Sequence, residues 1–230
     1  MPDIPARLAA VRARFDAAVQ AAGRDPASVR LLAASKTRTP DAVRVAIAEG
    51  QRLFGENRAQ ELRDKGTALD GEPIEWHFIG ALQKNKVKYV VGRATLIHSV
   101  DSLALAEAID GRVARQGLPP VDVLVQVNVG REPSKSGATP EDTLALARAI
   151  DALGHVNVVG LMTIPPAVDD PRDAAPFFDE MVALAAAGRD AGLALRELSM
   201  GMSHDMEVAI AHGATIVRVG TAIFGPRSYA

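Results

Sequence analysis

A lysine stands at the end of the first apolar run of the sequence. Residues 29–35 read VRLLAAS, and Lys36 follows them directly. In a mostly apolar pocket the charged form of an amine is disfavoured, so its pKa falls and the neutral amine can attack a carbonyl group. Lys36 could equally be a strand-end lysine whose stem lies along the protein while its ammonium reaches water. Position alone therefore leaves a Schiff-base lysine and a structural lysine as alternatives.

Two later segments carry the residue types of an anion site. In residues 199–205 (SMGMSHD), Gly201 lets the backbone approach a ligand closely, and Ser203 supplies a hydroxyl before the helix expected at residues 206–212. Gly220 and Thr221 offer the same pair of features just after Arg218. The alternative is a tight turn and a buried arginine paired with a carboxylate. Two such loops in adjacent units favour a phosphate site.

Short apolar runs alternate with Ala-rich helical stretches along the chain. We expect strands at residues 29–35, 53–57, 75–80, 96–100, 121–128, 156–163, 197–202 and 216–224, most of them followed by a helix. Continuous apolar strands are typical of a parallel sheet buried on both faces. Eight such units predict an α/β fold, the (β/α)8 TIM barrel. An open doubly wound sheet is the alternative, but no G-x-G-x-x-G turn follows the first strand.

Two helices lead to expectations of their own. Residues 5–22 carry an apolar face with Leu8, Val11 and Phe15. Because the chain stops soon after the eighth expected strand, we predict that this helix completes the outer ring beside that strand. A free amphipathic arm for a partner is the alternative. The charge-rich helix at residues 58–65 is expected to be a solvated face.

The composition excludes several classes of function. The 230 residues carry 26 Lys plus Arg against 28 Asp plus Glu and no Cys. This balance gives no electrostatic reason to bind nucleic acid or an anionic membrane, and the missing cysteine excludes disulfides and thiolate chemistry. We find no metal-ligand spacing, secretory signal or membrane-spanning run, so a single cytoplasmic domain over residues 1–230 is expected.

The motifs together resemble one family. They are ASKT (34–37), FGEN (54–57), WHFIG (76–80), SKSG (134–137), GLM (160–162), SMGMS with DM (199–206) and RVGTAIFG (218–225). They run in the order found in the pyridoxal phosphate homeostasis protein family, which the chain closely resembles. The resemblance implies an alanine racemase N-terminal-like barrel that binds pyridoxal 5′-phosphate.

The resemblance also implies residue roles. Lys36 would bind the cofactor's aldehyde as a Schiff base, Asn57 would lie near the ring hydroxyl, and Arg218 would face the pyridine nitrogen. An arginine there leaves that nitrogen unprotonated and the ring a weak electron sink. The remaining expected cofactor-binding residues are Gly201, Ser203, Gly220 and Thr221 at the phosphate, and Lys135 as a secondary contact. Some bacterial members end in two lysines, whereas residues 227–230 here read RSYA.

The expected role is to store and deliver the cofactor rather than to turn over a substrate. Alanine racemases need a second base, a tyrosine from another domain, and this chain has only Tyr89 and Tyr229. We therefore predict no catalytic residues and a monomer whose partners are pyridoxal phosphate and the apo forms of enzymes that use it. The alternatives are an amino-acid racemase or lyase with Lys36 as its only base, and a Schiff-base aldolase acting on a sugar phosphate.

Overall fold

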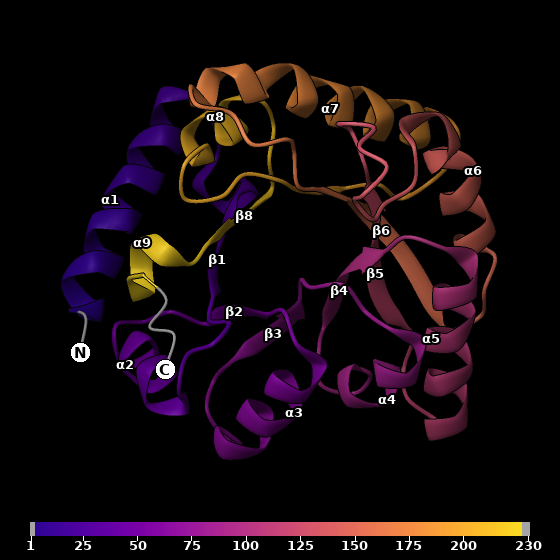
Figure 1. The fold of residues 1–230 in the computed structure, drawn as a ribbon, viewed down its shortest axis with the longest axis horizontal. Helices are drawn as coiled ribbons and strands as arrows, with labels where there is room; N and C mark the ends of the chain where they lie inside the picture. The colour runs from indigo at the N-terminus through magenta and orange to yellow at the C-terminus, as the bar shows by residue number, and fades with distance from the viewer. Residues whose placement is uncertain (1–2, 227–230) are drawn as a thin grey trace.

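The strands close into a parallel barrel. The computed structural model describes residues 3–226, so Tyr229 and the other residues of 227–230 lie outside it. The strands are β1 (Arg30–Ala34), β2 (Leu53–Glu56), β3 (Glu75–Phe78), β4 (Leu96–Val100), β5 (Val121–Val127), β6 (Val156–Thr163), β7 (Glu197–Ser199) and β8 (Ile216–Val219). Each pairs in parallel with the next, and β8 pairs with β1 (Figure 1). The TIM barrel is confirmed, and the doubly wound alternative is wrong.

Helices surround the barrel on its outer side (Figure 1). They are α2 (Pro40–Ala48), α3 (Ala59–Ala68), α4 (Val87–Val90), α5 (Leu103–Gln116), α6 (Pro140–Asp151), α7 (Ala175–Asp190) and α8 (Met206–Ala211). The Thr-Pro helix starts form as expected. Thr39 accepts a hydrogen bond from the Ala42 amide, and Thr139 accepts one from the Asp142 amide.

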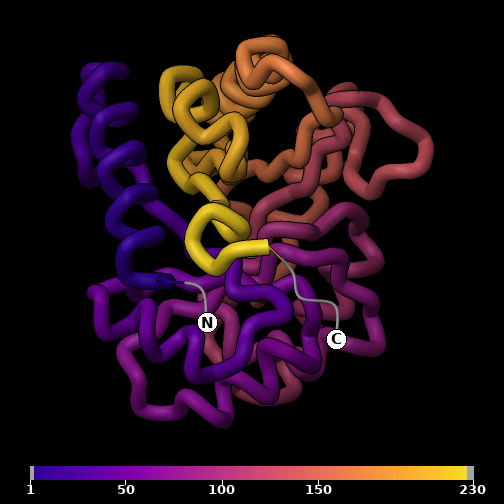
Figure 2. Tube along the Cα trace, turned by 60° about the vertical axis from the view of Figure 1, so that its left-hand side comes forward, coloured from indigo at the N-terminus to yellow at the C-terminus, as the bar shows by residue number. Residues whose placement is uncertain are grey.

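The N-terminal helix α1 (Ile4–Ala21) is part of the ring. Asp3 caps it by accepting from the Ala6 amide, and Leu8, Val11 and Val19 are buried. The helix packs against α2, α8 and α9. In Figure 2, α1 is the indigo helix, and it lies beside the yellow C-terminal segment. The predicted ring-completing role is confirmed, and the free-arm alternative is wrong.

The predicted C-terminal boundary of the last strand is wrong. Strand β8 stops at Val219, and α9 (Thr221–Phe224) follows, so a short helix stands where we expected strand. The amides of Ile223 and Phe224 both donate to the carbonyl of Gly220, which closes the turn. The apolar run TAIF has the residue types of a strand, but Ile223 and Phe224 are buried on a short helix that packs against α1.

Alternate residues of each strand fill the barrel interior. An apolar cluster forms its core, with Leu32, Leu53, Ile79, Leu96, Leu124, Val159, Met162 and Ile216 among its members. Buried polar side chains, His77, His98, Ser199 and Arg218, accompany this cluster. Among the described helices, none is long and apolar enough to cross a membrane.

Candidate functional site

Lys36 lies at the mouth of the barrel, two residues after the end of β1. The Ser35 amide donates to the Gly55 carbonyl, and Ala34 pairs with Gly55 across β1 and β2. Continuing this register by two residues places Lys36 and Asn57 at the same height on neighbouring strands. The two predicted residues therefore lie at neighbouring positions at the carboxyl ends of the strands, where barrels of this type bind ligands.

A buried ion pair holds the backbone on the N-terminal side of Lys36. The Ser35 hydroxyl donates to Glu56 Oε1 over 2.6 Å, and the Lys65 ammonium donates to Glu56 Oε1 and to the Ser35 carbonyl, both over 2.7 Å. Lys65 is only 5% exposed, so the expected solvated face of the helix at 58–65 is wrong at this residue. Lys65 points inward because its ammonium pairs with the buried Glu56 carboxylate at the end of β2.

The following residue, Thr37, is held from the same helix. Its amide donates to Glu61 Oε2 over 2.8 Å, and its φ is 64°, a left-handed value that threonine adopts at a cost. Both neighbours of Lys36 are thus tied to α3 or to the end of β2. This bracing fixes the direction in which the lysine leaves the strand.

Burial and pairing act in opposite directions on Glu56. Burial raises the pKa of the Glu56 carboxyl to about 6, and the adjacent Lys65 ammonium and Ser35 hydroxyl limit the rise. One carboxylate oxygen, Oε1, accepts both hydrogen bonds, whereas Oε2 is buried without a hydrogen-bond partner among the described residues. Loss of Lys65 would therefore leave the buried Glu56 carboxylate without its ion-pair partner.

Arg218 lies below the mouth. It pairs in register with Leu32, four residues below Lys36, and is 6% exposed. Its Nη1 donates to the Ser199 hydroxyl over 2.6 Å, and its Nη2 donates to the Thr163 carbonyl over 2.8 Å. Burial lowers the pKa of Arg218 to about 10, which still leaves it charged at neutral pH. A donor-only cation thus lies at the floor of the site.

The two predicted anion loops follow neighbouring strands. The Arg218 amide donates to the Gly201 carbonyl, which ties the loop after β7 to β8. Gly201 has φ +91°, and a Cβ there would lie 2.4 Å from the Ala209 Cβ, so only glycine fits. A Cβ on Gly220 would lie 3.1 Å from the Ala34 carbonyl oxygen. Ser203 and Thr221, one in each loop, remain accessible to solvent.

The remaining predicted residues differ in their surroundings. Asn57 Oδ1 is buried and has no hydrogen-bond partner in the described part of the chain, so it can accept from a ligand. Lys135 lies in the loop between β5 and α6, four strands round the barrel from Lys36, where it pairs with Glu132 Oε1 over 2.5 Å. Tyr89 lies on α4, with the guanidinium of Arg63 above its ring, which agrees with a packing role.

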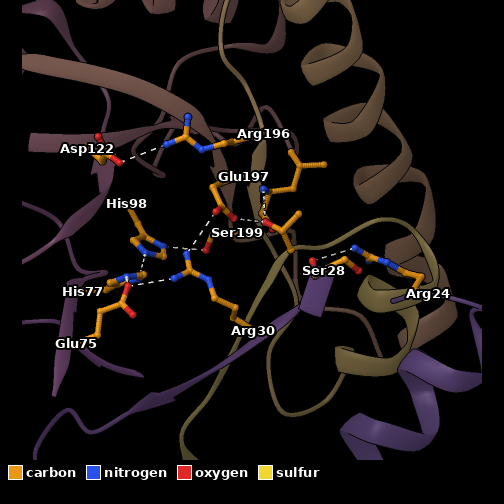
Figure 3. A network of polar contacts seen from close by, with 12 residues as sticks. Arg24, Ser28, Arg30, Glu75, His77, His98, Asp122, Arg196, Glu197 and Ser199 are labelled. Carbon is orange, nitrogen blue, oxygen red and sulfur yellow. Dashed lines mark hydrogen bonds and ion pairs between the residues drawn. The ribbon is translucent and has the colours of Figure 1, made fainter. Parts of the chain in front are cut away.

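Sequence reasoning missed a line of polar groups inside the barrel. His98 Nδ1 lies 2.8 Å from the Ser199 hydroxyl, His98 Nε2 lies 2.9 Å from His77 Nδ1, and His77 Nε2 lies 2.9 Å from Glu75 Oε1 (Figure 3). The sequence alone leaves His77 either facing the site or packed within its strand, with packing the more common outcome, and makes His98 a structural residue. The alternation of side chains along a strand could have predicted their inward direction, because His77 is two residues from the inward-facing Ile79.

The fold and the site define a barrel of the alanine racemase N-terminal domain class, and that family matches residues 6–228. Two relatives, from Aquifex aeolicus and Pseudomonas aeruginosa, are 46% and 47% identical over 97% and 100% of this chain and 98% of each relative. Both are named pyridoxal phosphate homeostasis protein. The structure of PipY from Synechococcus elongatus PCC7942 with PLP bound is 38% identical, with a TM-score of 0.83 over 97% of this chain and 100% of that one. The chain belongs to the pyridoxal phosphate homeostasis protein family, as its motifs predict.

Proposed function

We propose that this protein, as one domain, binds pyridoxal 5′-phosphate reversibly at the barrel mouth and passes it to apo-enzymes, without substantial turnover of its own. The main support is the position of Lys36, which is half-buried at the mouth beside the anchored Ser35. Arg218, which can only donate hydrogen bonds, lies below it. We place this role in the cytoplasm and expect a monomer.

The residues present fit the chemical groups of this cofactor. Pyridoxal phosphate supplies an aldehyde that a lysine amine binds reversibly, together with a pyridine ring and a phosphate. Lys36 would hold the aldehyde, and Arg218 would donate to the ring nitrogen. Asn57 would satisfy its unpartnered Oδ1 at the ring hydroxyl. The phosphate would lie against the two loops after β7 and β8, with Gly201, Ser203, Gly220 and Thr221; Lys135 would be a secondary contact.

Arg218 favours storage over catalysis. A guanidinium only donates hydrogen bonds, so a ring nitrogen facing it must accept and stays unprotonated. The ring then withdraws electrons weakly, which limits carbanion chemistry. Tyr89 lies under the cation of Arg63 on the outer helix ring and is poorly placed to serve as a second base. A racemase or lyase that uses Lys36 as its only base is the second candidate, favoured by the alanine racemase fold class.

The test is an absorbance spectrum of the protein mixed with pyridoxal phosphate, before and after borohydride. We expect a violet-region band in the wild type that borohydride removes and that Lys36→Ala lacks. Lys84→Ala, which removes an exposed lysine elsewhere, should keep the band. No band in the wild type would overturn the proposal and favour a sugar-phosphate aldolase. Sustained conversion of an amino acid by the loaded protein would favour the racemase or lyase.

A further inference from the structure

The barrel interior holds more polar groups than the proposed cofactor site uses. His77, His98 and Ser199 are fully buried, and the side chains around them form an otherwise apolar cluster. A buried polar group without a partner is costly, so such groups persist where they are satisfied or functional. Figure 3 shows the contacts that run from Ser199 through His98 and His77 to Glu75. Arg218 donates to Ser199 at the other end, so the five residues form a single file.

The two ends of this file fix the direction of every hydrogen bond in it. Arg218 has donors only, so the Ser199 hydroxyl accepts from it and has its single hydrogen left for His98 Nδ1. At the other end the ionised Glu75 carboxylate only accepts, so His77 carries its hydrogen on Nε2. His98 Nε2 must then donate to His77 Nδ1. Both ends require the same arrangement.

That arrangement makes both histidines neutral, each with its hydrogen on Nε2. A proton added to His98 Nδ1 would displace the Ser199 hydrogen, for which Arg218 offers no acceptor. Burial lowers the pKa of both rings, and the nearby charges of Arg218 and Arg30 lower that of His98 further. Glu75 raises the pKa of His77 without outweighing burial.

The far end of the file is anchored in a charged cluster at the opposite mouth of the barrel. Arg30 lies between Glu75 and Glu197, at 3.0 and 3.4 Å, and Thr215 donates to Glu197 over 2.6 Å. A cavity of about 250 Å³ opens there, lined by these charges and by Asp122. Glu75 at this end is therefore open to solvent, whereas His98 and Ser199 are fully buried.

We propose that Ser199, His98, His77 and Glu75 are positioning residues that form a one-directional hydrogen-bond file and hold Arg218 in a single orientation toward the cofactor ring. This inference rests on the proposed function for the identity of the ring. It adds that residues on the far side of the barrel determine how Arg218 presents its donors. An interruption anywhere along the file should change the environment of the bound ring.

The first test needs no cofactor. Nitrogen NMR of the histidine-labelled protein should show two histidines that are neutral, protonated on Nε2 and unchanged from pH 5.5 to 8. His77→Gln and His98→Gln assign these two signals. A hydrogen on Nδ1 of either ring, or titration of either ring near its ordinary pKa, would overturn the file. This result stands whether or not pyridoxal phosphate binds.

The second test uses the protein loaded with pyridoxal phosphate. Ser199→Ala should shift the absorbance maximum of the bound cofactor and weaken its binding about tenfold, as expected for one lost charge-assisted hydrogen bond. Glu75→Leu, at a partly exposed site that tolerates change, should shift the band in the same direction. Glu75→Gln keeps an acceptor for His77, so its absorbance band should stay at the wild-type position. Asp122→Asn, a neighbour outside the file, should match the wild type.

Wild-type spectra and affinity in both Ser199→Ala and Glu75→Leu would mean that the file does not position Arg218. If the wild type binds no pyridoxal phosphate, the proposed function fails, and the NMR result alone then decides whether the file exists.

Discussion

Lys65 shows how a single charge supports the site from behind. Its ammonium serves the Glu56 carboxylate and the Ser35 carbonyl at once, so it joins the ends of β1 and β2 directly next to Lys36. Removal of one member of a buried ion pair leaves the other charged and unpaired, which costs more than removal of both.

Lys65→Met should therefore lower the free energy of unfolding by about 3–5 kcal/mol at pH 8. The loss should be smaller at pH 5, because the pKa of Glu56 is already about 6 and its unpaired carboxyl would take up a proton. Urea unfolding at both pH values measures the effect. The double variant Lys65→Met with Glu56→Leu should recover most of the loss; a double variant as unstable as the single one would contradict the role of the pair.

At the scale of elements, the turn between β7 and α8 depends on Gly201. Replacement by alanine combines a strained φ of +91° with a Cβ 2.4 Å from the Ala209 Cβ. Gly192 is a matched control, since its φ is +88° and no atom lies within 4 Å of an added Cβ.

We expect Gly201→Ala to destabilise the protein by about 1–3 kcal/mol more than Gly192→Ala does, because only the former adds overpacking to backbone strain. Pyridoxal phosphate binding should weaken in Gly201→Ala alone, since its turn carries Ser203. Thermal unfolding and cofactor titration of the two variants measure this. Equal stability and equal cofactor binding of the two variants would mean that the turn can shift to accommodate the added methyl group.

The elements also show what the sequence could predict. The apolar strands and Thr-Pro helix starts are local signals, and they predict the barrel correctly. The helix at Thr221–Phe224 was missed because TAIF has the residue types of a strand and is made helical by its packing. Lys65 was missed because its partner, Glu56, lies on a different element, and the interior histidines were missed because Ser199 is 101 residues from His98.

For the whole molecule, the buried histidines govern stability in mild acid. Burial lowers the pKa of His77 and of His98 below the ordinary 6.5, so the unfolded chain binds protons that the folded chain does not. Their contribution is complete above pH 6.5 and is lost as the pH falls below it. Glu56 acts in the opposite sense between its ordinary pKa of 4.5 and about 6, but it is one group against two.

We expect the free energy of unfolding to fall below pH 6.5 by up to about 1.4 kcal/mol per pH unit for each neutral histidine. Urea unfolding between pH 5.5 and 7.5 measures this slope, and His98→Gln should reduce it. A wild-type stability that does not change over this range would show that the two rings take up protons in the folded protein.

The position of α1 has a consequence for how the chain is made. The apolar face of α1 is synthesised first, yet α8 and α9, which cover much of it, are among the last described elements to leave the ribosome. Synthesis runs at about 5–20 residues per second, so roughly ten seconds or more pass before α8 and α9 emerge to cover this face. The barrel cannot close before β8 is made, so we expect the face of α1 that α8 and α9 cover to stay exposed until the end of synthesis.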